Sequence, residues 1–333
     1  MKRLLLVTGS GRSGTSSVAG TLKRLGMHIP QPEVETDERN PLGYYEPLWS
    51  AEFHKEWLEG IAVRTIDTRP HAGEVAMATV TPEREETLRA WVDGELAARS
   101  DGEVVLVKET RAYWVYPLWE RVAAATGAEL MSLTMLRHPT QVVRSRDTAY
   151  LSGQSDELRL QRETANVAAW MNSVFVTERA SRGNPRAFVP YYDLVGDWRA
   201  AITRAAGQLG LDVGDLSAPH PVDDFITPTL NRSSDAWDGL HVPDDLKQLA
   251  EQTWAAANAL VVDPADATAR AELDGLREQY AAMYAAAAAI ASDEKVAAVL
   301  EAKQELRARL EVKNQRLDKL RAELKQLRGD APA

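Results

Sequence analysis

Short apolar runs alternate with longer segments of helical periodicity through the first 210 residues of the chain. The apolar runs are continuous, which is typical of strands buried on both faces of a sheet. They predict four strands, at residues 4–7, 104–107, 130–136 and 187–190. The segments between and after them predict helices at residues 14–25, 48–58, 82–99, 114–126, from about 139, 156–182 and 193–209. This alternation predicts an α/β fold with a three-layer, mostly parallel sheet, and helix dominates beyond residue 210.

Residues that favour helix ends support these limits. Thr81 and Pro82 form an N-cap followed by proline at the first helical position. Glycine follows three of the predicted helices, at Gly26, Gly127 and Gly210. Asp193 is expected to cap the helix that follows the fourth strand.

Residues 293–328 carry a heptad pattern. Positions spaced alternately by three and four residues form one seam: Val296, Val299, Lys303, Leu306, Leu310, Lys313, Leu317, Leu320, Leu324 and Leu327. A single amphipathic helix lying on its own globular domain is one interpretation, but the sustained 3.5-residue period and the dense flanking charge favour a coiled coil. The stems of Lys303 and Lys313 can lie along a two-stranded seam while their charges reach solvent, so we expect a homodimer.

These patterns divide the chain into three predicted regions. Residues 1–265 form the α/β domain, residues 266–292 a helical extension, and residues 293–328 the coiled coil. The 44% hydrophobic and 26% charged content is that of a globular protein. A formal net charge of −10 disfavours a general nucleic-acid partner, and the absence of cysteine removes disulfides and thiolate metal sites.

The apolar run at residues 4–7 is too short for the core of a signal peptide. No other stretch approaches the length of a transmembrane segment. A cytoplasmic location is therefore expected.

A glycine- and serine-rich loop between the first strand and the first helix is a candidate anion site. It reads Gly9-Ser10-Gly11-Arg12-Ser13-Gly14-Thr15-Ser16. Its backbone N–H groups and the helix N-terminus suit a phosphate or sulfate group. Gly9 and Gly14 have Walker A spacing, but Thr15 stands where the lysine of that motif belongs. Arg12 is the loop's only cation, and its guanidinium can hold an anion with paired hydrogen bonds.

A second group of polar residues follows the third predicted strand. Arg137 stands at the strand end and Ser145 lies eight residues later, on the next helix. Ligands of α/β proteins bind at the carboxyl edge of a parallel sheet, where both residues are expected.

Together these motifs resemble those of sulfotransferases that use 3′-phosphoadenosine 5′-phosphosulfate (PAPS). The loop, with Gly11, Arg12, Ser13, Gly14, Thr15 and Ser16, is similar to their 5′-phosphosulfate loop, and Arg137 with Ser145 to their 3′-phosphate motif. Weaker similarities lie at residues 189–194 and at residues 225–234, where Arg232 matches a further phosphate-binding arginine. The resemblance covers about residues 3–235 and implies a P-loop NTPase-like sulfotransferase fold. It also implies PAPS as co-substrate, with 3′-phosphoadenosine 5′-phosphate (PAP) as product.

The acceptor hydroxyl needs a base, and residues 40–46 resemble a segment of bacterial sulfotransferases whose glutamate lies near the transferring sulfate. That residue is Glu46 here, and the tyrosines beside it would keep water away and make it a stronger base. Lys108 is the expected cation facing the sulfuryl group, with Arg12. The histidine that some members carry after the second strand is absent, and Glu109 is the reserve base. We expect no metal ion, since PAPS has no γ-phosphate.

The sequence thus predicts a PAPS-dependent O-sulfotransferase. The expected acceptor is a hydroxyl of a glycan, a glycolipid or another small molecule, with carbohydrate or lipid-linked glycan favoured. A P-loop kinase or NTPase with a degenerate Walker loop is one alternative, weakened by Thr15 and by the lack of a recognisable metal-binding aspartate. A non-catalytic scaffold acting through its coiled coil is another, weakened by the presence of Arg12, Arg137 and Ser145 together.

Overall fold

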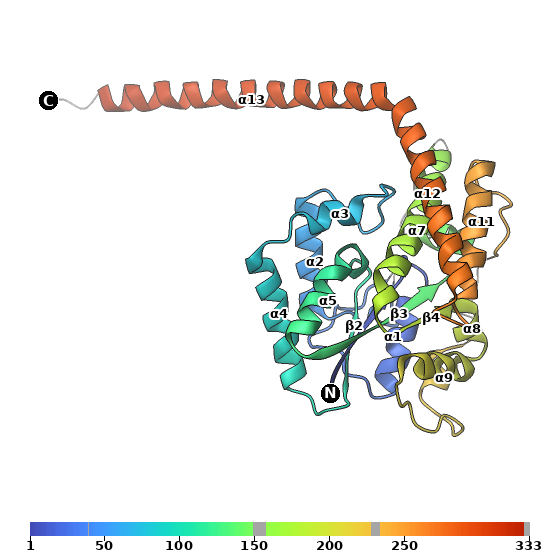
Figure 1. The fold of residues 1–333 in the computed structure, drawn as a ribbon. Coiled ribbons are helices and arrows are strands. Elements are labelled where there is room, and N and C mark those ends of the chain that lie inside the picture. Colours follow the sequence, from blue (N-terminus) through green and yellow to red (C-terminus); the bar gives the residue numbers. More distant parts are fainter. Residues whose placement is uncertain (39, 149–157, 228–233, 330–333) are drawn as a thin grey trace. The chain divides into compact units, whose positions relative to one another are not determined.

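A sheet of four parallel strands forms the centre of the molecule, in the order β2-β1-β3-β4 (Figure 1). The structure is a computed structural model that describes residues 1–38, 40–148, 158–227 and 234–329. The strands are β1 (Lys2–Thr8), β2 (Val104–Lys108), β3 (Ala128–Leu136) and β4 (Arg186–Pro190). All four predicted strands are confirmed, and their carboxyl ends share one edge because every pair is parallel.

Helices cover both faces of this sheet, which explains why its strands are apolar without alternation. Leu5 and Val7 of β1 pack with helices α1 (Thr15–Arg24) and α9 (Trp198–Leu209). Leu4 and Leu6 point to the other face, where they join side chains of α4 (Pro82–Ala97) and α5 (Tyr116–Ala125). Figure 1 shows α4 and α5 on the opposite side of the sheet from α1 and α9. The predicted three-layer α/β fold is confirmed.

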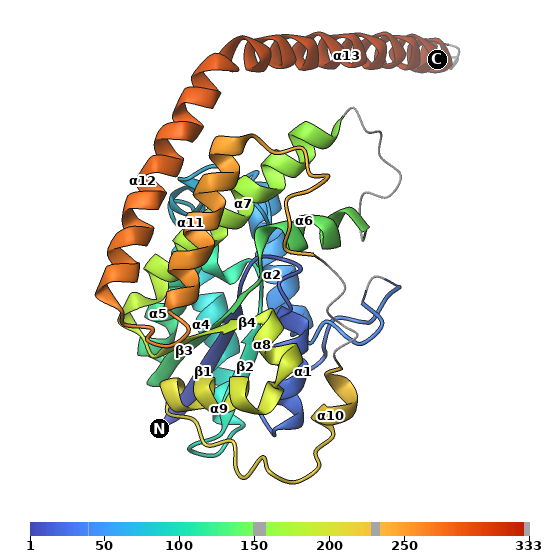
Figure 2. The same ribbon diagram turned by 90° about the vertical axis from the view of Figure 1, so that its right-hand side faces the viewer.

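Further helices complete this arrangement, seen from a second direction in Figure 2. They are α2 (Leu48–Gly60), α3 (Ala72–Met77), α6 (Pro139–Arg146), α7 (Arg159–Ala180), α8 (Tyr191–Gly196), α10 (Val222–Phe225) and α11 (Asp244–Ala259). The predicted cap of α4 is confirmed, since the Thr81 side chain accepts a hydrogen bond from the Arg84 backbone N–H at 3.2 Å.

Two helix predictions were wrong in detail. Residues 112–115 form a 3₁₀ turn, and α5 starts only at Tyr116, where a proline in its first turn has no N–H to lose. The helix predicted at 193–209 is divided into α8 and α9 by Asp197, whose backbone is not helical (φ −147°, ψ 87°). Asp197, not Asp193, is the cap, because its Oδ1 accepts the Ala200 N–H at 3.0 Å. The predicted start at residue 156 lies outside the described residues.

The chain separates into two compact units, residues Met1–Tyr280 and Ala281–Ala333. Helix α12 (Ala267–Ile290) begins in the first unit, where Leu273, Leu276 and Tyr280 are buried. The second unit contains α13 (Ser292–Gly329), in which every described side chain is exposed. The side chain of Leu327 lies outside those the structure describes. The coiled coil and the three predicted regions therefore stay predictions.

Candidate functional site

The carboxyl edge of the sheet gathers the residues that the sequence singled out. From β1 the chain crosses to β2 on one side, and it later returns to β3 on the other side. In α/β proteins, ligands bind at the carboxyl ends of two neighbouring strands whose connections run in opposite directions. Strands β1 and β3 are such a pair here. The Gly9–Gly14 loop follows β1, Arg137 follows β3 and Lys108 ends β2. The predicted donor-binding motifs therefore meet at one edge.

Two glycines let the loop lie close to the neighbouring strands. Gly9 has a φ of +135°, and a Cβ there would lie 2.7 Å from the backbone oxygen of Met135 in β3. Gly14 has a φ of +95°, and a Cβ there would lie 2.3 Å from the ring of Tyr191. Only glycine satisfies both the conformation and the space. The loop then opens directly into α1, whose first N–H groups have no partners within the helix.

Ser13 lies in this loop with its hydroxyl turned away from solvent. The residue is 1% exposed, and its Oγ has no hydrogen-bond partner among the residues that the structure describes. Its backbone N–H is used locally, donating to the Ser10 carbonyl at 3.0 Å. A buried hydroxyl without a partner costs about 1–3 kcal/mol. An anion oxygen in the loop would supply the missing partner.

Arg12 connects the loop to the second motif. Its Nε donates to Ser145 Oγ at 3.1 Å, and its carbonyl oxygen accepts from Arg137 Nη1 at 3.0 Å. The structure therefore brings Arg12 into contact with Arg137 and Ser145, which lie 125 and 133 positions further along the chain. Arg12 has a φ of +72°, so the loop holds it in a conformation that non-glycine residues seldom adopt.

Arg137 is held rigidly beneath this loop. It is 7% exposed, and its guanidinium lies 4.3 Å from the centre of the Tyr191 ring. Its Nε donates to Gln141 Oε1 at 3.2 Å, and its carbonyl accepts from Trp170 Nε1 at 3.1 Å. Burial, and to a smaller extent the repulsion from Arg12, lower the pKa of Arg137. An anion bound beside both guanidinium groups would relieve this repulsion.

Residues 40–46 are fastened to the start of α1, which fixes the position of Glu46. Asn40 Nδ2 donates to Ser16 Oγ at 3.2 Å and to the Gly43 carbonyl at 2.7 Å. Tyr45 lies against Gly20 of α1, where an added Cβ would come within 2.7 Å of its ring. The segment is therefore part of the same site as the loop.

Glu46 and Lys108 form a buried ion pair at the end of β2. The Lys108 Nζ donates to Glu46 Oε1, and the two side chains are 4% and 11% exposed. Lys108 pairs with Val7 in the sheet, one residue before the strand end that leads into the loop. The pair predicted to act on the sulfuryl group thus adjoins the loop, with the ring of Tyr44 6.0 Å from Nζ.

Glu109, the reserve base, lies in a different environment. It is fully buried, and its Oε1 accepts from the Arg111 backbone N–H at 2.8 Å and from Arg111 Nε at 2.7 Å. Its Oε2 lies 3.9 Å from His54 Nδ1. Burial lowers the pKa of His54 to about 3, so the ring is neutral; its Nδ1–H donates to the Ser50 carbonyl at 2.7 Å and its Nε2 accepts from Trp119 Nε1 at 3.2 Å. This cluster is structural.

Sequence reasoning missed three contributors. Tyr191 covers Arg137, Asn40 anchors the segment of Glu46, and Arg146 approaches the loop at Gly11. Arg146 stands next to Ser145, and its charge was the one available signal. Arg232, a predicted phosphate ligand, lies outside the described residues.

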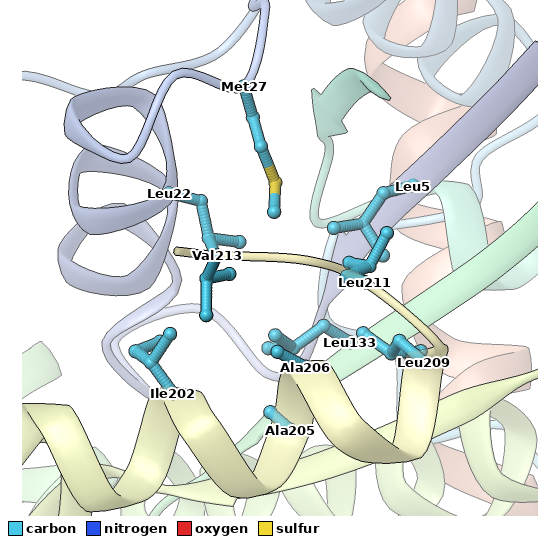
Figure 3. Close-up of a pocket in the computed structure, with 10 residues that line it drawn as sticks. All are labelled: Leu5, Leu22, Met27, Leu133, Ile202, Ala205, Ala206, Leu209, Leu211 and Val213. Atoms are coloured by element: carbon cyan, nitrogen blue, oxygen red, sulfur yellow. The ribbon is translucent and has the colours of Figure 1, made fainter. Parts of the chain in front are cut away.

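Two other features add nothing to the site. The cavity in Figure 3 lies between α1, the sheet and α9, and its lining is entirely apolar, including Leu22, Leu133 and Ile202. It belongs to the hydrophobic core. Within the ranges that the structure describes, no group of three or more His, Asp or Glu side chains could hold a metal ion. No helix in these ranges is long and apolar enough to cross a membrane.

The protein has an α/β fold with a glycine-rich loop at the carboxyl edge of its parallel sheet. No family model and no curated protein matches the sequence. Solved structures that are similar to this chain include three sulfotransferases. The sulfotransferase domain of the Synechococcus PCC 7002 olefin synthase has 18% identity and a TM-score of 0.41, over 75% of this chain and 95% of that domain.

The second is the sulfotransferase domain of the curacin biosynthetic pathway, with 16% identity and a TM-score of 0.36, over 72% of this chain and 82% of that domain. The third is a sulfotransferase from Mycobacterium tuberculosis H37Rv, with 14% identity and a TM-score of 0.39, over 77% of both chains. All three are described as sulfotransferases or sulfotransferase domains.

Proposed function

We propose that the chain is a PAPS-dependent O-sulfotransferase. The observation that carries this proposal is the convergence of Arg12, Arg137 and Ser145 around a loop whose buried Ser13 Oγ has no partner. Two guanidinium groups and an unpaired hydroxyl at a helix N-terminus suit a ligand with more than one anionic group. PAPS has this chemistry, with a 3′-phosphate and a 5′-phosphosulfate.

Each end of the donor has its own set of residues in this proposal. The loop from Gly11 to Ser16, with Arg12 and Ser13 Oγ, holds the 5′-phosphosulfate. Arg137 and Ser145 hold the 3′-phosphate. The Nε of Arg12 already contacts Ser145 Oγ, so the two anionic groups would bind side by side on a preformed surface.

The chain's own residues supply the rest of the reaction. Glu46 accepts the proton of the acceptor hydroxyl while the new O–S bond forms and the bond from sulfur to the 5′-phosphate oxygen breaks. Lys108 faces the negative charge that develops on the bridging oxygen, and PAP leaves with the electron pair. Lys108 also holds the Glu46 carboxylate in place. Both glutamates are buried and ion-paired, and Glu46 is favoured as the base because its segment is fastened to the start of α1 beside the loop, whereas Glu109 contacts Arg111 and His54.

Two further expectations rest on the sequence alone, namely a carbohydrate, glycolipid or other small hydroxylated acceptor and a cytoplasmic location. The homodimer expected through residues 293–328 rests on the apolar seam alone, and the charges of α13 disfavour it. Arg232 remains a proposed phosphate ligand on the resemblance alone.

Replacing Arg137 tests the donor assignment. We expect Arg137→Ala to weaken PAPS binding by about 2–4 kcal/mol, because a charge-assisted contact to the 3′-phosphate is lost. Adenosine 5′-phosphosulfate, which lacks this phosphate, should bind the variant and the wild type alike. Isothermal titration measures both affinities, and Arg89→Ala, which changes an exposed arginine paired with Glu86, is the matched control. Equal losses for the two nucleotides would refute the assignment.

A further inference from the structure

The described part of α13 presents a long apolar seam with no partner. Leu306, Leu310 and Leu317 are each at least 50% exposed, as are several other seam residues. If Val296 is assigned to heptad position a, the seam occupies positions a and d, with Lys303 at a and Lys313 at d. Positions e and g flank the seam and contact any helix that binds it.

Charge is divided sharply between the two sides of this helix. Positions a, d, e and g of the described side chains carry seven cations and only the acidic residues Asp293 and Glu323. The cations are Lys295, Lys303, Arg307, Arg309, Lys313, Arg316 and Arg321. The opposite positions b, c and f carry mostly acids, namely Glu294, Glu301, Glu305, Glu311 and Asp318, with Lys319 and Lys325. The face that would meet a partner is therefore strongly basic.

This division disfavours a second copy of the chain as the partner, although the seam alone predicts one. In a parallel pair Lys303 and Lys313 would each face their own counterpart, and Arg316 would face Arg321 across the interface. In an antiparallel pair centred on the seam, Arg309 would face Arg316. Like charges placed opposite each other are destabilising in both orientations.

The same pattern also disfavours a flat membrane surface. A strict seven-residue repeat drifts by about 20° per heptad around a straight helix, so the seam turns through roughly 90° along α13. A stripe that winds in this way matches a partner helix that supercoils with it rather than a plane. Aromatic residues, which anchor interfacial helices, do not occur in residues 292–329.

We propose that α13 binds an amphipathic helix of another protein whose e and g positions are acidic. Leucines of the partner would cover Leu306, Leu310 and Leu317, and carboxylates would reach Lys303 and Lys313 along the seam. Charge complementarity of this kind selects partners as well as holding them. In the free helix Arg309 and Arg321 contact Glu305 and Asp318 instead, through exposed pairs that a partner's carboxylates can replace at little cost.

Two synthetic helices test the proposal on the full-length chain. Both have about five heptads with leucine or valine at a and d, and they carry either glutamate or lysine at every e and g position. Titration followed by fluorescence anisotropy should show one-to-one binding of the acidic peptide, at least about 100-fold tighter than the basic one and weaker at high salt. Equal affinity for the two peptides would overturn the proposal.

A charge-reversed variant and two further measurements complete the test. Replacing Arg307, Arg309, Arg316 and Arg321 by glutamate should reverse the preference between the peptides and leave nucleotide binding unchanged, because these residues lie outside the donor site. Light scattering on the full-length chain at about 10 µM should give the mass of a monomer. A dimer that dissociates when residues 293–333 are removed would establish a second copy as the partner instead. Binding to phosphatidylserine vesicles with no preference between the peptides would establish a membrane surface.

Discussion

Two adjacent residues at the end of β2 belong to opposite kinds of polar cluster. Lys108 pairs with Glu46 beside the loop, whereas Glu109 is fully buried with Arg111 and His54. Successive side chains of a strand point to opposite faces, so one residue reaches the ligand edge and the next enters the core. The role of each charged residue here depends on the face of the sheet to which its side chain points, and not on its residue type.

The two clusters also differ in how their polar groups are satisfied. In the core cluster Arg111 donates to both carboxylate oxygens of Glu109, and both ring nitrogens of His54 have partners. Beside the loop, Ser13 Oγ is buried without a partner among the described residues, and burial and, to a smaller extent, Arg12 lower the pKa of Arg137. The first cluster stabilises the fold, whereas the second keeps a buried hydroxyl and two neighbouring guanidinium groups that an anion would complement.

The largest expected effect comes from removing the base. Glu46→Gln keeps the shape of the side chain and should lower sulfuryl transfer by about 10²–10⁴-fold, the usual contribution of general base catalysis. PAP affinity should change little, although the change also removes the counter-charge of the buried Lys108 and should lower the free energy of unfolding. Radiolabelled PAPS with a panel of hydroxylated acceptors gives turnover, and titration with PAP gives the affinity.

Glu109→Gln is the matched change in the core cluster. It leaves a buried arginine without its counter-charge and should lower the free energy of unfolding by about 3 kcal/mol. At a temperature where it stays folded, the variant should retain PAP binding. A Glu46→Gln protein with nearly full turnover, or a Glu109→Gln protein that is stable but inactive, would contradict this assignment. Glu109 would then be the base and Glu46 the structural residue.

A smaller effect is expected from the pH dependence of stability. Because burial lowers the pKa of His54 from 6.5 to about 3, the unfolded chain binds a proton that the folded chain does not between these values. The free energy of unfolding that depends on neutral His54 is fully present above pH 6.5 and is lost as the pH falls. The expected loss is about 2 kcal/mol at pH 5 relative to pH 8.

Urea unfolding at both pH values measures this loss. His54→Gln can keep the donor to Ser50 and the acceptor from Trp119 without titrating, so its stability should fall less on acidification by about that amount. An identical fall in variant and wild type would contradict a neutral, buried His54.

The fold was predictable because its signals are local. Continuous apolar runs mark strands buried on both faces, and the glycine-rich loop with Arg12 stands directly between one such strand and a helix. The parallel sheet then requires Arg137 to reach the same edge as this loop. The break at Asp197 was missed because the residues around it have a helical pattern. An aspartate in such a pattern can continue the helix or cap a new one, and the folded chain uses Asp197 as the cap of α9.

The pairing within the site was not predictable in the same way. Glu46 and Lys108 are 62 residues apart, and no periodicity connects them. Glu46 pairs with Lys108 and Glu109 with Arg111 because of how the chain packs around α2 and β2. The sequence does not distinguish them, since each is a single glutamate beside aromatic or charged neighbours. Ser13 was one small residue among several in the loop, and only the folded chain shows that its hydroxyl is left without a partner.

The central claim is that the cluster of Arg12, Ser13, Arg137 and Ser145 at the carboxyl edge binds a nucleotide with a 3′-phosphate. Isothermal titration of the full-length protein with PAP and with ATP, both without Mg²⁺, tests it most directly. We predict that PAP binds at least about 100-fold more tightly than ATP, because Arg137 and Ser145 contact a phosphate that ATP lacks. Tighter binding of ATP, or equal binding of both nucleotides, would contradict the account.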